Sequence, residues 1–423
     1  QLAFVAQGVP AGQLAAVRGT VVGRPSLRRG LMSMLVQFFQ DRDLRAVVAP
    51  FLQLPAKRAL RAASPALLAA SQALISGQHA LLYLCGGNEP AGNCRSSVEI
   101  FDARTGQWTA APSMSEGRLC AAGAALGGHV YICGGVQGSD NETASVERFD
   151  LARGIWERLP DMREARSGAA AAPLAGRLVV CGGMNPVRSS VEVFDPEVSM
   201  WQAGPSLNSA RARPVAAEFD GRLFVCGGFE NGPGGRRNLS SVEALEAGAL
   251  MGWLGAAASS AHGERVAGAE EAAWAAAPSL SGPRFGAAAA VVGPRLFVCG
   301  GEGARSGYLR SAELLGRGAP CWETLPEMHE MRFGASAFAV AGRLYIGGGI
   351  GTSPLIECLD PETDTWAQTT ATWTQRTSMM GVACRASAQS PASTPSAAGA
   401  QPWRRCPRTS PGRWRRWSRG APR

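Results

Sequence analysis

The sequence predicts an all-β fold made of six copies of one four-stranded unit, and two spacings carry this prediction. A Trp is followed ten residues later by an Arg at six places: Trp108/Arg118, Trp156/Arg166, Trp201/Arg211, Trp274/Arg284, Trp322/Arg332 and Trp366/Arg376. Five of these Arg residues are followed sixteen positions later by a Gly-Gly doublet, beginning at Gly134, Gly182, Gly227, Gly300 and Gly348, and a sixth doublet (Gly86-Gly87) precedes the first Trp. A period of about 48 residues indicates a repeat architecture, and it favours binding over catalysis.

Each unit reads as four short strands in a fixed order. The first strand follows the Arg and is rich in Ala and Gly, as in residues 285–292, which suits a crowded innermost strand of a radial arrangement. The second strand is a continuous β-prone run that ends at the doublet, as in residues 178–183. The third strand begins Ser-Val-Glu, as in residues 97–102, and the fourth begins near Trp and ends at a Pro four residues later.

The spacings separate rigid from variable parts of the unit. The distance from the Glu of the third strand to the Trp is nine residues in five units but 31 in the fourth, from Glu243 to Trp274. We therefore predict an insert at about 247–269, and its Ala/Gly/Ser-rich composition favours a flexible loop. The distance from doublet to Glu varies freely from unit to unit, so the loop between the second and third strands is where the units differ.

Gly-Gly, Ser-Val-Glu-x-Phe-Asp, Trp, Pro-x-Met/Leu and Arg together resemble the kelch repeat, over about 81–384 or roughly 70% of the chain. The resemblance implies a six-bladed β-propeller over residues 80–384. The first unit has Ala70 where its Arg is expected, whereas residues 376–384 read as a lone first strand that would close blade one and remove an open sheet edge. The alternative is that residues 66–77 supply that strand.

Successive loops of such a blade alternate between two faces, so the recurrent Arg and the loop between strands two and three share one face. We predict a ring of Arg118, Arg166, Arg211, Arg284, Arg332 and Arg376 on it. Around the ring stand Asn88, Arg95, Asn141, Asn185, Arg188, Asn231, Arg236, Arg237, Arg305, Tyr308 and Arg310. Because a guanidinium binds a carboxylate or phosphate through two parallel bonds, the ring could capture an acidic or phosphorylated peptide. Alternatively, each Arg braces a blade junction by bonding loop carbonyls or a neighbouring Glu.

Catalysis finds little support in the sequence. The four His residues (His79, His129, His262 and His329) have no paired ligand spacing, so we expect no metal and no cofactor. Some kelch-type propellers are enzymes, but no copper ligand set or nucleophile–base arrangement stands out. The eleven cysteines, five of them directly before a doublet, read as small buried hydrophobes of a reducing, cytoplasmic compartment. No apolar run approaches the length of a membrane span.

The two ends of the chain carry its basic charge. Residues 1–80 have nine basic residues and two acids, and residues 385–423 have nine Arg and no acid, so the repeats themselves are acidic and no specific nucleic-acid binding follows. Residues 1–79 are expected to be partly helical and faintly resemble an F-box, although they are too short for BTB and BACK domains. Residues 385–423 read as a disordered Arg/Pro/Ser-rich tail, whose interleaved Arg and Trp could bind RNA or acidic membranes.

These observations predict a non-catalytic protein-interaction module. The most specific hypothesis is a substrate-recognition adaptor of a cullin-type ubiquitin ligase that binds an acidic peptide on the Arg-lined face. The alternative is a cytoskeletal or signalling scaffold without ligase association. An enzyme on the same fold is the third hypothesis.

Overall fold

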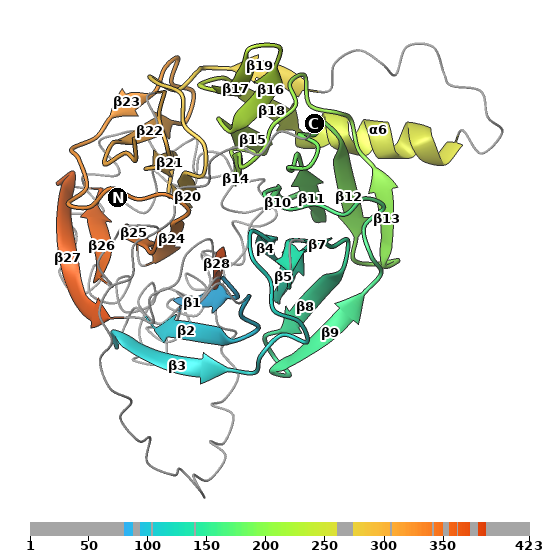
Figure 1. Cartoon of the computed structure of the whole chain (residues 1–423), viewed down its shortest axis with the longest axis horizontal. Helices are drawn as coiled ribbons and strands as arrows, with labels where there is room; N and C mark the ends of the chain where they lie inside the picture. Colours follow the sequence, from blue (N-terminus) through green and yellow to red (C-terminus); the bar gives the residue numbers. More distant parts are fainter. Residues whose placement is uncertain are drawn as a thin grey trace, which may run out of the picture. The chain divides into compact units, whose positions relative to one another are not determined.

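Six four-stranded antiparallel sheets stand around a common centre in the computed structural model (Figure 1). The structure describes residues 80–87, 94–102, 105–138, 141–259, 274–304, 307–340, 342–349, 355–361, 363–372 and 380–385. These residues all belong to one compact unit, Gln1–Ser387. The innermost strands β4, β10, β14, β20, β24 and β28 each contact the next, and β28 contacts β4, which closes the ring. The prediction of a six-bladed, nearly all-β propeller is confirmed.

Blades one to three hold the following strands, given from the inside outward. Blade one consists of β28 (Met380–Arg385), β1 (Ala80–Cys85), β2 (Val98–Asp102) and β3 (Gln107–Ala111). Blade two consists of β4 (Ala122–Leu126), β5 (His129–Cys133), β8 (Val146–Asp150) and β9 (Ile155–Leu159). Blade three consists of β10 (Ala170–Leu174), β11 (Arg177–Cys181), β12 (Val191–Asp195) and β13 (Met200–Ala203).

Blades four to six repeat the same order. Blade four consists of β14 (Val215–Phe219), β15 (Arg222–Cys226), β18 (Val242–Glu246) and β19 (Trp274–Ala277). Blade five consists of β20 (Ala288–Val292), β21 (Arg295–Cys299), β22 (Ala312–Gly316) and β23 (Glu323–Thr324). Blade six consists of β24 (Ser336–Val340), β25 (Arg343–Gly347), β26 (Leu355–Asp360) and β27 (Thr365–Thr372).

Two small hairpins stand in the loops between second and third strands. In blade two, β6 (Val136–Gln137) pairs with β7 (Asn141–Glu142). In blade four, β16 (Phe229–Gly232) pairs with β17 (Gly235–Asn238). These hairpins lie in the loops whose lengths differ most freely in the sequence, so the blades differ structurally on this face.

The C-terminal strand closes the ring, as the sequence predicts. β28 pairs antiparallel with β1, with Val382 opposite Tyr83. The strand occupies the innermost position of blade one, the position for which residues 66–77 were the alternative. Those residues, the helical segment expected before residue 80 and the tail after residue 385 lie outside the described residues.

The insert in blade four differs from its prediction. Its first part is not a loop but the helix α6 (Ala247–Ser259), which follows directly from β18, while residues 260–273 lie outside the described part of the chain. Leu250 is fully buried in the cluster shared by blades three and four, and the indole of Trp253 donates to the carbonyl of Ala203 at 3.3 Å. The helix forms because these two side chains find partners on the propeller wall.

The hydrophobic core lies between the blades rather than within them. The described residues contain a buried cluster at each of the six junctions, and each cluster draws on two neighbouring sheets. Small Ala and Gly side chains of the inner strands leave a central channel between the sheets, lined by residues 121–123, 169–171, 214–216, 287–289 and 335–337. The β16–β17 hairpin and the segments that join consecutive blades stand at one end of this channel.

Candidate functional site

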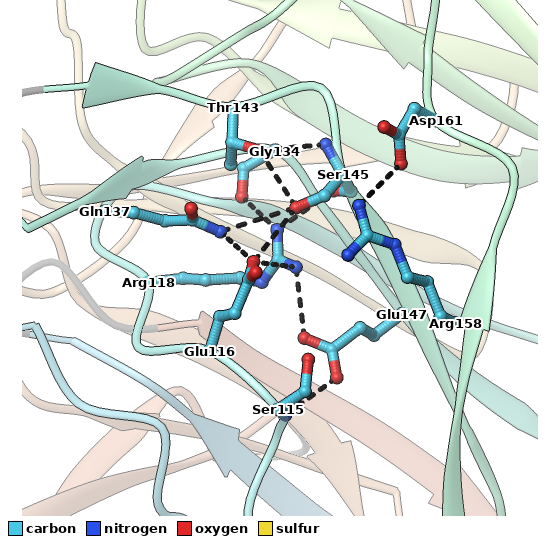
Figure 2. A network of polar contacts seen from close by, with 10 residues as sticks. All are labelled: Ser115, Glu116, Arg118, Gly134, Gln137, Thr143, Ser145, Glu147, Arg158 and Asp161. Atoms are coloured by element: carbon cyan, nitrogen blue, oxygen red, sulfur yellow. Dashed lines mark hydrogen bonds and ion pairs between the residues drawn. The ribbon is translucent and has the colours of Figure 1, made fainter.

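The recurrent Arg of blade two is a buried structural tie (Figure 2). Its Nη1 donates to the carbonyls of Gly134 and Ser145 at 3.0 and 2.9 Å, and its Nη2 donates to Glu147 at 3.0 Å. The other oxygen of Glu147 accepts the backbone N–H of Ser115 at 2.8 Å. Arg118 and Glu147 are each 2% exposed. The pair thus ties the segment between blades one and two to the third strand of blade two.

The same tie recurs in the four following blades. An Arg that is 0–3% exposed pairs with the Glu of the Ser-Val-Glu strand or its equivalent, in the pairs Arg166–Glu192, Arg211–Glu243, Arg284–Glu313 and Arg332–Glu357. Each of these carboxylates also accepts at least one backbone N–H from the segment joining its blade to the preceding one, given by Arg163, Asn208, Ser281 and His329. Buried charges are tolerated when they are paired and hydrogen-bonded in this way.

This geometry corrects the predicted placement of the Arg ring. Five of the six guanidinium groups lie inside the blades and are occupied by internal carbonyls and carboxylates, and Arg376 lies outside the described residues. The arrangement is the one expected if each Arg braces a blade junction. A spacing in the sequence shows that a residue recurs but not in which direction its side chain points. The sequence alone therefore does not distinguish an exposed ring of Arg residues from Arg residues that brace the blade junctions.

Two further repeated features complete the joint. The indole of each Trp in blades two to six donates to the carbonyl of a Pro at the end of the preceding blade, for example from Trp201 to Pro160 at 2.9 Å. The first Gly of each doublet has a positive φ, and in blades one to five it faces the backbone of the next blade, so that a Cβ at Gly134 would lie 2.3 Å from the carbonyl oxygen of Arg166. Trp and doublet are therefore parts of the scaffold.

The loop residues singled out in the sequence fall in different places. Asn185 donates to Glu142 at 3.3 Å, and Arg188 reaches Glu164 at 3.4 Å, both at blades two and three. Arg95 is half-buried and bonds through its backbone to Gly87 and Arg118. Tyr308 belongs to blade five, Asn141, Asn231, Arg237 and Arg310 are exposed in their separate loops, and Asn88 and Arg305 lie outside the described residues. The candidates therefore do not converge on one pocket.

A group of arginine and aromatic side chains gathers instead at one end of the central channel, over blades four to six. We call it the channel-mouth cluster and define it as Arg213, Phe229, Arg236, Phe285, Tyr308 and Phe333. Phe285 packs edge-on against Phe229 and Phe333, both at 5.2 Å between ring centroids, and Tyr308 stacks on Phe333 at 5.2 Å. Tyr308 is 37% exposed, so the cluster reaches the surface.

The hairpin of blade four positions one side of this cluster. Arg236 lies over the rings of Phe285 and Phe229, at 4.6 and 5.5 Å from their centroids, and its guanidinium donates to Glu302 at 2.8 Å. Asn238 of the same hairpin donates to the carbonyl of Gly303 at 2.7 Å. The hairpin of blade four thus contacts the loop between the second and third strands of blade five, and these contacts fix the relative positions of the aromatic rings.

Sequence reasoning missed most of this cluster, although a signal was present. In blades five and six the recurrent Arg is followed directly by Phe, whereas blades two, three and four have Leu119, Ser167 and Ala212 at that position. A residue that departs from the repeat in two neighbouring blades marks a local function, because the scaffold does not require it. The same holds for Arg213, which stands where blades three, five and six have Gly.

The buried cysteines are chemically inert in the fold. Desolvation by burial raises the pKa of the Cys133, Cys181, Cys226 and Cys299 thiols to about 12, against the lowering effect of nearby arginines. Among the described residues no group of His, Cys, Asp and Glu could hold a metal ion, and no described helix is long and apolar enough to cross a membrane. The side chains at the channel mouth are cationic and aromatic, and such groups are suited to recognition.

Fold and site together define the class: a six-bladed β-propeller of the kind that serves as a protein-interaction module. Comparison with protein families then identifies three kelch motifs, at residues 81–115, 117–163 and 165–208, which correspond to blades one, two and three. Blades four to six share their strand order and, as far as described, their Arg–Glu ties. No curated protein matches the chain.

Proposed function

We propose that this chain recognises a protein partner at the end of the channel that carries the blade-joining segments and the loops between strands two and three, which we call the loop face. The partner segment is an acidic peptide, and the chain acts as the substrate-recognition adaptor of a ubiquitin ligase. The observation that supports the peptide site is the channel-mouth cluster, which the scaffold does not require and which has no counterpart among the described residues of the other blades. The kelch motifs support a protein-interaction module, and the adaptor role is our more specific proposal for that module.

The composition of the cluster suits a protein interface. Tyr and Arg are enriched among the residues that dominate binding energy, because a rigid aromatic ring buries much area at little cost in side-chain freedom and a guanidinium forms several directed hydrogen bonds. Arg236 is already held on two Phe rings and by Glu302, so little ordering remains to be done when a partner arrives.

The test uses the full-length tagged chain expressed in human cultured cells, followed by crosslinking and quantitative mass spectrometry. The informative variant is Tyr308→Ala, which removes an exposed ring of the cluster. Its matched control is Val198→Ser, because Val198 is 59% exposed on the turn between β12 and β13, at the opposite end of the blades. We expect Tyr308→Ala to lose most substrate capture while a cullin-type scaffold remains bound, and Val198→Ser to lose neither.

Two outcomes would contradict the proposal in different ways. Partner capture without any ubiquitin-ligase scaffold, in the wild type as well as in the variants, would remove the adaptor role and leave the scaffold alternative. Equal loss of capture in Tyr308→Ala and Val198→Ser would show that the loop face does not carry the partner site.

A further inference from the structure

Arg213 occupies a left-handed backbone position that three other blades fill with glycine. It is the second residue after the recurrent Arg211, and its φ is 49°. The equivalent residue of blade two is Cys120, with a φ of 52°, and those of blades three, five and six are Gly168, Gly286 and Gly334, with φ of 57°, 61° and 65°. A side chain in this left-handed region is disfavoured, and non-glycine residues that persist there concentrate at functional sites.

These equivalent residues form a rim around the channel. The N–H of each donates to the carbonyl of the residue in the preceding blade, from Gly168 to Cys120, from Arg213 to Gly168, from Gly286 to Arg213 and from Gly334 to Gly286, at 2.8, 2.8, 3.0 and 2.8 Å. A side chain on this rim therefore starts at the edge of the channel mouth.

The Arg213 side chain extends across that mouth. Its Nη2 lies 3.2 Å from the sulfur of Cys120 in blade two, and its Cζ lies 5.4 Å from the ring centroid of Phe333 in blade six. Blades two and six flank blade one, which stands opposite blade four in the ring (Figure 1). A side chain of blade four that contacts residues of both blades lies over the channel mouth.

The charge of Arg213 is not neutralised by the described part of the protein. Arg211 pairs with Glu243 and Arg236 with Glu302, whereas the guanidinium of Arg213 contacts a thiol and an aromatic ring and pairs with no carboxylate among the described residues. A thiol is a weak acceptor, and a guanidinium has five N–H donors. Most of the donors of a half-buried cation at the channel mouth thus remain available to an anionic group.

We propose that Arg213 receives the carboxylate of an acidic side chain of the partner, and that the exposed ring of Tyr308, which stacks on the buried Phe333, receives an apolar side chain next to it. This assignment rests on the proposed function and specifies its site. A carboxylate accepts two parallel N–H bonds from a guanidinium, and Phe333 holds the plane of the guanidinium from the other side. Arg213, rather than the buried recurrent arginines, then sets the preference for acid.

The test measures peptide binding to the full-length protein by fluorescence polarisation. The probes are nonapeptides with an acetylated N-terminus, an amidated C-terminus and a central Glu flanked by Leu or Phe. Each is compared with two peptides of the same sequence in which Gln or phosphoserine replaces the central Glu. Arg213→Gly is the informative variant, because Gly is what three other blades carry at this position. Arg213→Lys keeps the charge, and Arg310→Ala removes an exposed Arg of a neighbouring loop as the matched control.

We expect the wild type to bind at least one Glu peptide about tenfold or more tightly than the matched peptide with a central Gln. Arg213→Gly should reduce this ratio to near one at an unchanged melting temperature, Arg213→Lys should retain part of it, and Arg310→Ala should retain all of it. No preference for Glu in the wild type, or an unchanged preference in Arg213→Gly, would overturn the assignment. Binding of the phosphoserine peptides alone would show that Arg213 binds a phosphate group and would overturn its assignment to a carboxylate. Partner capture by the full chain in cells separates failure of this site from failure of the proposed function.

Discussion

At the scale of single residues, Arg211 and Arg213 show how position decides what a side chain does. Arg211 is fully buried, and its charge is balanced by Glu243 and two carbonyls. Arg213, two residues further, has a left-handed backbone that turns its side chain toward the channel, where the described residues provide no counter-charge. The first arginine therefore stabilises the blade, and the second is available for binding.

Two substitutions that exchange glycine with another residue should therefore differ in their effect on stability. Arg213→Gly relieves a left-handed strain of about 1 kcal/mol and loses a cation–π contact of similar size, so the free energy of unfolding should stay within about 1 kcal/mol of the wild type. Gly134→Ala should cost about 2 kcal/mol or more, because its Cβ would lie 2.3 Å from a backbone oxygen at a φ of +63°. Urea unfolding of both variants checks this. A larger loss for Arg213→Gly than for Gly134→Ala would contradict it.

The buried thiols predict a loss of stability at alkaline pH. In the unfolded chain a thiol ionises above pH 9, whereas Cys133, Cys181, Cys226 and Cys299 keep their protons until about pH 12 in the fold. Between these values the unfolded state binds fewer protons, so stability falls as pH rises through this window, by up to about 1.4 kcal/mol per pH unit for each thiol. Urea unfolding between pH 7 and 10.5 measures the slope, and Cys226→Ala should reduce it.

An independent measurement checks the same burial. Iodoacetamide at pH 8.5 should label the exposed Cys321 and leave the four thiols unmodified, as read by peptide mass spectrometry. Rapid labelling of Cys226 in the native protein would show that these sites open to solvent, and the alkaline slope would then have another cause.

At the scale of elements, the joint between consecutive blades is the repeated unit of stability. In blades two to six, the Glu of the third strand binds both the recurrent Arg of its own blade and at least one backbone N–H of the segment that arrives from the preceding blade. The Trp of the fourth strand bonds a Pro carbonyl of the preceding blade. This explains why the interval of ten residues from Trp to Arg is constant while the loops between strands two and three vary.

Two acids of the same strand test how much the joint contributes. Glu243→Gln leaves the buried Arg211 charge without its counter-charge and should lower the free energy of unfolding by about 3 kcal/mol or more. The side chain of Glu246 is 55% exposed and pairs with Arg222, so Glu246→Gln should lower the free energy of unfolding by less than about 1 kcal/mol. Chemical unfolding of the two variants gives both values. Equal losses would show that the buried pair carries no special share of stability.

At the scale of the whole molecule, the sequence predicted the architecture because the scaffold is what repeats. Trp, Pro, Arg and the doublets lie at the blade joints, so their spacing revealed six blades and the strand that closes them. The candidate site was predicted only in part, through Tyr308 and Arg236, because binding residues such as Arg213 and Phe333 are departures from the repeat. The helix α6 was missed because its stability depends on Leu250 and Trp253 contacting the propeller wall, and composition does not record tertiary contacts.

Closure of the ring leads to the last prediction. β28 pairs along its whole length with β1, and it contacts the inner strands β24 and β4 of the neighbouring blades. A chain that ends at Met379 lacks this strand, so blade one keeps three strands and both of its junctions lose a partner. We expect the melting temperature to fall by more than about 10 °C, since about 1 kcal/mol corresponds to 2–4 °C in a domain of this size. A chain that ends at Ser387, where the compact unit ends, should melt within about 2 °C of the full-length protein. If both truncated chains melted at the temperature of the full-length protein, β28 would be dispensable and the ring would not depend on its C-terminal strand.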